Sequence, residues 1–230
     1  NLKPELIGHI SRDATAIDGR EKPRKKAAKP KAEPKKRGRH AKGEKREPKA
    51  PKRLERQLEQ TAEESLAELP AWCDVGTKKN SKGYKETWIG DKLHADVNDC
   101  GLPISVALTA ASLHDSQAAI PLMKMSSAKV DYLYDVMDAA YDAGPIYEIS
   151  RSLGHVPLID KNARGKEVVP MAPHEAVRYN ERTVVERFNS RIKEEFGGDN
   201  VMVRGASKVM MHLMFGVLAL FADHLIKLAT

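Results

Sequence analysis

The chain is poor in cysteine, in aromatic residues and in long apolar runs. Only Cys73 and Cys100 are present, and neither belongs to a Cys-x2-Cys pair. A zinc site is therefore not expected, and a reducing compartment is the simplest assumption. No signal peptide is visible, and the longest apolar run, near residues 213–222, is interrupted by Asp223 and His224. That run is too short for a membrane span, so none is expected.

Positive charge is concentrated in one segment. Residues 20–53 contain 17 Lys and Arg against four Glu, a net charge of 17 − 4 = +13. The whole chain carries +7, so the remainder carries 7 − 13 = −6. This imbalance favours binding of a polyanion, with nucleic acid first. Repeated Lys-Pro and Glu-Pro steps and almost no large apolar residue predict that the segment is disordered or extended.

The basic segment offers many candidate contacts to DNA phosphates, which would make binding dependent on salt. A solubilising insertion in a surface loop is the alternative. The candidate phosphate-binding residues here are Lys25, Lys26, Lys35, Lys36 and Arg37.

Short apolar runs separated by turn residues predict an α/β domain. Strands are expected at residues 6–17, 84–97, 102–111 and 155–160, with another that begins at 130 and leads into Asp138. A polar turn is expected at 78–83. Helices are expected at 52–69 in two pieces, after 116, at 177–196 and at 207–228. We divide the chain into a first strand (1–19), a basic insert (20–53), a helical insert (54–70) and the remaining domain (71–230).

One stretch near the C-terminal end has polar residues at helical spacing. Arg182 follows Tyr179 by three residues, Glu186 follows after four more, and Lys193 after a further seven. These steps return to one face of a helix with about 3.6 residues per turn. Arg and Lys bind phosphate oxygens and Glu can hold a hard cation, whereas the plainer alternative is a solvated face with weak salt bridges. The apolar stripe expected to face the core is Val184, Val185, Phe188 and Ile192.

The spacing Tyr-x2-Arg-x3-Glu-x6-Lys resembles the signature of the DDE transposases of bacterial insertion sequences. Two upstream motifs are similar to the aspartate motifs of the same family: Asp13-Ala-Thr15 and Asp138-Ala-Ala-Tyr-Asp142. The stretches 83–94 and 108–115 also resemble this family. The likeness covers nearly the whole chain outside the insert and the helix after it. The N-terminal DNA-binding domain of the family is missing, and because the chain starts at Asn1 inside a strand-like segment, we expect the C-terminal part of a longer gene product.

Each aspartate has an alternative interpretation from the residues alone. Asp13 lies inside a strand, where a carboxylate is usually on the solvent face. Asp138 follows a buried strand, the position where α/β folds place their chemistry, and Asp135 remains open as its alternative. Asp142 is interpreted as the cap of the next helix, and His114 and Asp115 as caps of the helix after 116.

The resemblance implies a ribonuclease H-like fold, a mixed sheet flanked by helices, in which Asp13, Asp138 and Glu186 are catalytic and bind metal. Carboxylates brought together repel one another, and Mg²⁺, or Mn²⁺ in its place, would relieve this; two ions are expected. Arg182, Lys193 and Tyr179 would contact DNA.

The implied activity is metal-dependent cleavage of double-stranded DNA followed by strand transfer at the ends of an insertion sequence. A homodimer in the active complex and a cytoplasmic, nucleoid-associated location in a bacterium are expected with it. The alternatives are a ribonuclease H-like nuclease without strand transfer and an inactive, DNA-binding transposase relic.

Overall fold

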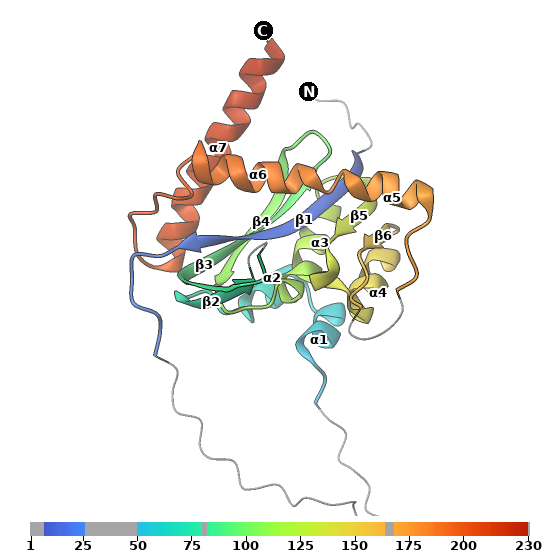
Figure 1. Cartoon of the computed structure of the whole chain (residues 1–230), viewed down its shortest axis with the longest axis horizontal. Coiled ribbons are helices and arrows are strands. Elements are labelled where there is room, and N and C mark those ends of the chain that lie inside the picture. The colour runs from blue at the N-terminus through green and yellow to red at the C-terminus, as the bar shows by residue number, and fades with distance from the viewer. Residues whose placement is uncertain (1–6, 26–49, 80–81, 164–167, 230) are drawn as a thin grey trace, which may run out of the picture.

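The computed structural model describes residues 7–25, 50–79, 82–163 and 168–229 (Figure 1). Most of the basic segment therefore lies outside the described residues, including Lys26, Lys35, Lys36 and Arg37. Its predicted disorder stays a prediction. Lys25 is described and exposed.

A six-stranded mixed sheet forms the centre of the molecule, with strand order β2-β3-β1-β5-β6 and β4 also paired with β3. β1 runs antiparallel to β3 and parallel to β5, which is in turn parallel to β6. This sheet, flanked by helices, confirms the predicted α/β, ribonuclease H-like architecture. The strands are β1 (Ile7–Asp18), β2 (Asp74–Lys79), β3 (Lys85–Asn98), β4 (Pro103–Ala110), β5 (Tyr132–Met137) and β6 (Val156–Ile159).

Helices cover both faces of the sheet (Figure 1). One face carries α1 (Arg53–Glu59), α2 (Ala62–Ala67), α3 (Ala119–Ser127) and α4 (Gly144–Ser152), with the short helices η1 (Asp115–Ala118) and η2 (Ala139–Tyr141) nearby. The other carries α5 (Pro173–Asn180), α6 (Thr183–Glu194) and α7 (Ala206–Ala229). Because side chains alternate along a strand, neighbouring residues of β1 face different helices.

The core under α6 and α7 is mainly aliphatic. Phe188 and Ile192 of α6 and Leu213 of α7 pack against Leu93 and Ala95 of β3. The expected apolar stripe of the C-terminal signature is buried as predicted, since Val184, Val185, Phe188 and Ile192 all belong to this cluster. The stripe fixes which side of α6 faces the sheet.

The opposite face of the sheet holds a buried ionic cluster centred on Arg12. Its guanidinium binds both oxygens of Asp96 at 2.6 Å and one oxygen of Asp135 at 3.3 Å. Ser126 of α3 donates to Asp96 at 2.6 Å, and Ser150 of α4 donates to Asp135 at 2.7 Å. The cluster therefore fastens two helices to three strands.

Charges in this cluster compensate one another despite complete burial. Burial opposes the charge of Arg12, but the neighbouring Asp96 and Asp135 more than offset it, and the pKa of Arg12 is raised. Burial would raise the pKa of Asp135, yet hydrogen bonding to His155 and the charge of Arg12 keep that pKa below its ordinary value. Asp135 is thus paired within the core, whereas Asp138 lies outside this cluster.

Two expectations about the elements were wrong. The signature stretch is not one helix, because the backbone tightens to i to i+3 hydrogen bonds at Glu181 and Arg182 and divides it into α5 and α6. Lys78 and Lys79 do not lie in a turn but end β2, which was not predicted. α7 agrees with the helix expected at 207–228; by length and composition alone it is long and apolar enough to cross a membrane, a test that the core helix of a soluble protein also passes. One side of α7 is buried against α6 and β4.

Candidate active site

Asp13 and Asp138 lie side by side at the point where β5 ends. The last paired residues of the parallel strands are Arg12 and Met137, so each aspartate is the next residue on its own strand. Adjacent strands lie about 4.8 Å apart, which brings the two carboxyl groups together. Asp13 faces α6, whereas Arg12 beside it faces α3 and α4.

Nearby positive charges only partly offset the buried negative charges of Asp13 and Asp138. Burial raises the pKa of Asp13 to about 7, with the negative charges of Asp138 and Asp115 acting in the same direction. Burial also raises the pKa of Asp138, although its side chain accepts a hydrogen bond from the Ala140 amide at 2.9 Å. Arg182 opposes both shifts by its charge. A cation at this position would offset the unfavourable free energy of keeping two carboxylates charged, buried and close together.

Glu186 does not join the aspartates in this structure. Its carboxylate binds Arg182 at 2.6 Å, and its side chain is 49% exposed against 23% for Arg182. Within the described ranges, no group of three or more His, Cys, Asp or Glu side chains is close enough together to hold a metal ion. Arg182 therefore stands between Glu186 and the two aspartates as a positive charge.

The other two signature residues lie on either side of this pair. Tyr179 lies in the last turn of α5, and its ring centre is 5.9 Å from the guanidinium carbon of Arg182. Lys193 lies almost two turns beyond Glu186 and binds Asp199 at 3.4 Å. The break between α5 and α6 means that the four residues share a side of two consecutive helices rather than one continuous ridge.

Three residues near the aspartates were not predicted as part of the site. Asp115 acts electrostatically on both aspartates and binds Lys92 at 2.7 Å, instead of capping the following helix as expected. Tyr141 is 1% exposed, and its hydroxyl has no hydrogen-bond partner among the described residues. Asn189 donates to Asp13 at 3.1 Å. Tyr141 belongs to the motif Asp138-Ala-Ala-Tyr-Asp142, so the resemblance to the family could have indicated that it lies near the aspartates.

The other capping expectations also fail. His114 bonds to Ser116 at 2.9 Å, with no side-chain cap on η1. Asp142 does not cap α4, whose N-cap is Ala143; it accepts from Tyr147 at 3.2 Å and lies 3.7 Å from Lys161.

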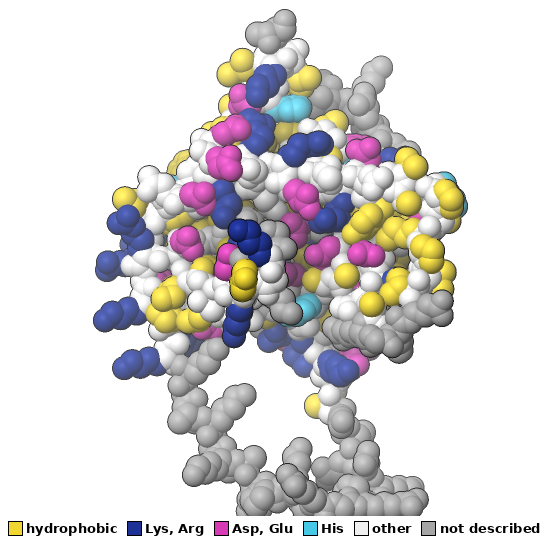
Figure 2. Space-filling view, viewed as in Figure 1, with side chains coloured by type: hydrophobic (Ala, Val, Ile, Leu, Met, Phe, Trp, Pro, Cys, Tyr) yellow, Lys and Arg dark blue, Asp and Glu magenta, His cyan; other side chains and the backbone are white. Residues whose placement is uncertain are grey.

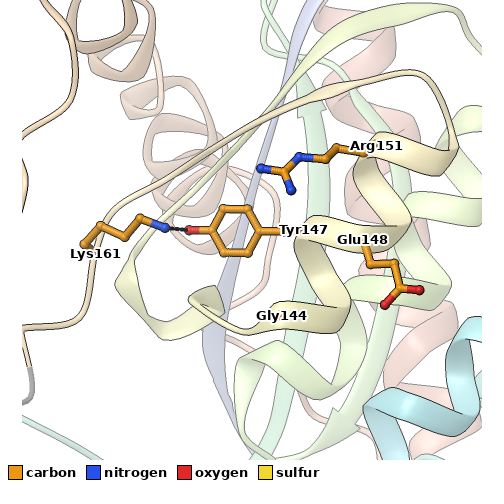
Figure 3. Close-up of a pocket in the computed structure, with 5 residues that line it drawn as sticks. All are labelled: Gly144, Tyr147, Glu148, Arg151 and Lys161. Carbon is orange, nitrogen blue, oxygen red and sulfur yellow. Dashed lines mark hydrogen bonds between the residues drawn. The ribbon is translucent and has the colours of Figure 1, made fainter.

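A cavity of about 520 Å³ lies at the start of α4 and is lined by Tyr147, Arg151 and Lys161 among others (Figure 3). The Lys161 ammonium donates to the Tyr147 hydroxyl at 2.5 Å and lies 4.1 Å from the centre of its ring. Arg151 approaches the same ring at 5.7 Å. Two cations therefore share the Tyr147 ring at the start of α4.

The surface shows the same juxtaposition. Acidic side chains gather just below α6, over the region of β1 and β5, with Lys and Arg side chains beside them (Figure 2). Among the described residues, Asp13 and Asp138 form the acidic pair of the site, and Asp115 acts on both of them by its negative charge. The carboxylates of Asp13 and Asp138 are ligands of the kind that hard divalent cations accept, and Glu186 would add a third only after leaving Arg182.

The comparison with family models agrees with this arrangement. The model for the transposase DDE domain matches residues 8–222. No curated protein matches the chain. Transposases of this family cleave DNA and generally use divalent metal ions. Since the match includes every strand but the first residue of β1 and most of the helices, the chain belongs to the DDE transposase family.

Proposed function

We propose that this chain is the catalytic domain of a transposase that cuts DNA at the ends of an insertion sequence and transfers the ends to new DNA. Asp13, Asp138 and Glu186 are the proposed catalytic residues. The observation that carries the proposal is the pairing of Asp13 with Asp138 beneath the helix that carries Glu186. Both aspartates have raised pKa values, as expected of a site built for cations.

Asp13 and Asp138 would hold divalent ions, Mg²⁺ or Mn²⁺ and most simply two, with Glu186 as the third ligand. Bound there, the ions would supply Lewis-acid chemistry for the attacking and leaving oxygens of a phosphodiester. The oxygen-only donor set and the unpaired Tyr141 hydroxyl beside it support this assignment. In the first proposed step, water attacks a phosphodiester at the element end and breaks the P–O3′ bond, which leaves a 5′-phosphate and a free 3′-hydroxyl. In the second, that 3′-hydroxyl attacks a phosphodiester of the target and displaces the target's own 3′-oxygen.

Arg182 has two proposed roles. Without DNA it neutralises Glu186, at 2.6 Å, and lowers the repulsion between the aspartates. A DNA phosphate offers it a bidentate partner and would release Glu186 for the metal. Lys193 would hold a phosphate further along the strand, and Tyr179 would pack on the DNA backbone.

Three further proposals follow if DNA is the substrate: roles for the two inserts, a dimeric complex and a location in the cell. The basic insert at 20–53 would add salt-dependent phosphate contacts outside the catalytic domain formed by 1–19 and 71–230, and the helical insert at 54–70 would add structure to one face. Two DNA ends must meet for transfer, so we propose a homodimer as the active complex. We also propose a cytoplasmic location at the bacterial nucleoid, because the proposed substrate, DNA, is there.

The direct test uses the full chain with labelled element-end DNA and a target plasmid, with Mg²⁺ or with a chelator. We expect nicked ends and then joined products, both lost in Asp13→Asn, Asp138→Asn and Glu186→Gln. The matched controls are Asp131→Asn on the exposed surface and Glu194→Gln on α6, which should act as the parent does.

Each outcome of this assay is informative. Cleavage without joining indicates the nuclease alternative, and DNA binding without cleavage indicates the relic. If any of the three variants cleaves at the parent rate, that residue is not part of the site.

A further inference from the structure

Asn189 is the described residue of α6 whose side chain reaches Asp13. It lies three residues after Glu186, between the core residue Phe188 and solvent, and is 8% exposed. Its Nδ2 donates to Oδ2 of Asp13 at 3.1 Å, across 176 residues of sequence. A carboxylate oxygen can only accept, so this contact orients the amide with its oxygen on the other side.

The amide oxygen of Asn189 has no partner. Oδ1 is buried and accepts no hydrogen bond from any residue in the described part of the chain. Leaving a buried acceptor unpaired is unfavourable, so each such group in a folded protein calls for an explanation. The Tyr141 hydroxyl, which is within electrostatic reach of Asp13 and Asp138, is unpaired too. Two unpaired polar atoms thus occur around one carboxylate pair.

An amide is suited to this position for chemical reasons. A lysine or arginine here would neutralise Asp13 and compete with a cation, while a fourth carboxylate would add to the repulsion. The neutral amide donates to one Asp13 oxygen and leaves the other oxygen free. Its own oxygen is a hard donor of the kind that divalent cations and their water shells accept. Groups of this kind around a metal ligand typically change metal affinity by about 10–100-fold.

We propose that Asn189 is a positioning residue for the divalent ion: Nδ2 fixes the orientation of Asp13, and Oδ1 accepts a hydrogen bond from the water shell of the ion. The proposal rests on the proposed role of Asp13 as a metal ligand. It extends the signature helix by one functional residue beyond Tyr179, Arg182, Glu186 and Lys193. It also explains why a polar side chain occupies a position next to Phe188 that is nearly buried.

Mn²⁺ binding measured by calorimetry, without DNA and without turnover, tests this inference. Asn189→Leu keeps the volume and removes both polar atoms, and we expect its Mn²⁺ dissociation constant to rise about 10–100-fold. Asn189→Asp keeps an oxygen beside the ion, and we expect it to bind Mn²⁺ at least as tightly as the parent. A purely structural residue would give no such opposite pattern. Asn200→Leu and Asn200→Asp, on the exposed link after α6, are the matched controls and should not change binding.

Asp13→Asn separates the two proposals. If it loses Mn²⁺ binding and Asn189→Leu binds as the parent does, only the Asn189 inference fails. If Asp13→Asn binds as the parent does, the metal role of Asp13 fails, and with it a positioning role that acts through Asp13. Should Asn189→Leu not fold, the side-chain amide protons of Asn189 in the parent provide the second test. Mn²⁺ must broaden their NMR signal more strongly than that of Asn200, and equal broadening overturns the inference.

Discussion

Each face of the sheet carries an arginine among carboxylates. The two groups differ in how far the protein itself neutralises the buried negative charges. On the α3 and α4 face, Arg12 and its carboxylate partners are fully buried, and hydroxyl groups complete their hydrogen bonds. On the α6 face, Arg182 pairs with a half-exposed Glu186 and compensates Asp13 and Asp138 only in part.

The difference separates a structural ion network from an acidic pair that lacks sufficient counter-charge. A buried charge is tolerated when the protein itself provides the counter-charge and hydrogen bonds, as it does around Arg12. Around Asp13 the protein leaves a deficit of positive charge, which is the usual arrangement where an external ion or ligand binds. Residues 12 and 13 are neighbours in sequence, so strand alternation alone assigns them to these two roles.

Removing Arg12 should give the largest effect. Arg12→Met leaves Asp96 and Asp135 buried without their counter-charge, and we expect unfolding free energy to fall by about 3–5 kcal/mol. Urea denaturation followed by circular dichroism measures it. Arg182→Met, on the open face, is the comparison and should cost less than about 1 kcal/mol. Equal losses in the two variants would mean that the two groups do not differ as described.

The pH dependence of stability should distinguish the faces next. Asp13 has a folded pKa of about 7 against an ordinary 3.8, so the folded state holds its proton more tightly than the unfolded state does. Stability of the metal-free protein therefore falls as pH rises from about 4 to about 7. Asp13→Asn should remove this loss and be more stable than the parent at pH 8 by about 2–4 kcal/mol, with little difference at pH 4.

Urea unfolding in the presence of a chelator at both pH values is the measurement for Asp13→Asn. Asp131→Asn, at an exposed position, is the control and should follow the parent. A destabilised Asp13→Asn at pH 8 would contradict the uncompensated state of this carboxylate.

Replacing Arg182 should give the smallest effect. It should strengthen the binding of Mn²⁺ and weaken the binding of DNA. Arg182→Met removes the charge that competes with a cation, so Mn²⁺ should bind about two- to fivefold more tightly without DNA, in line with the modest strength of exposed ion pairs. The same variant should bind element-end DNA more weakly. Calorimetry and a gel-shift titration measure the two. Arg187→Met, on an exposed side of α6, serves as control, and weaker Mn²⁺ binding by Arg182→Met would contradict the competition.

Local patterns predicted most of the fold. β1, the β3–β4 hairpin, β5, β6, both inserted helices and α7 follow from apolar runs and turn residues. The charged, glycine-containing β2 was missed because its strand character comes from pairing with β3, which is a tertiary contact. The break before Thr183 was missed because no Gly or Pro marks it.

The site could be predicted only in part, for a related reason. Asp13 and Asp138 were found from motif resemblance, and their roles remain proposals. No sequence pattern indicated that Asn189 belongs near the site, since its contact with Asp13 joins residues 176 apart. Capping by Asp115 and Asp142 was a sound local expectation, but lysines distant in sequence bind both carboxylates instead. Long-range charge pairs decide these side chains, and a sequence pattern does not contain them.

The pairing of β1 with β5 also has a consequence for how the protein folds. It joins residues 125 apart, as between Arg12 and Met137, whereas the β3–β4 hairpin is local. Contacts of such long range close a large loop and slow folding. The two aspartates become neighbours only when this pairing forms. In refolding, Mn²⁺ binding should therefore return later than helical circular dichroism, so the metal reports the completion of the sheet.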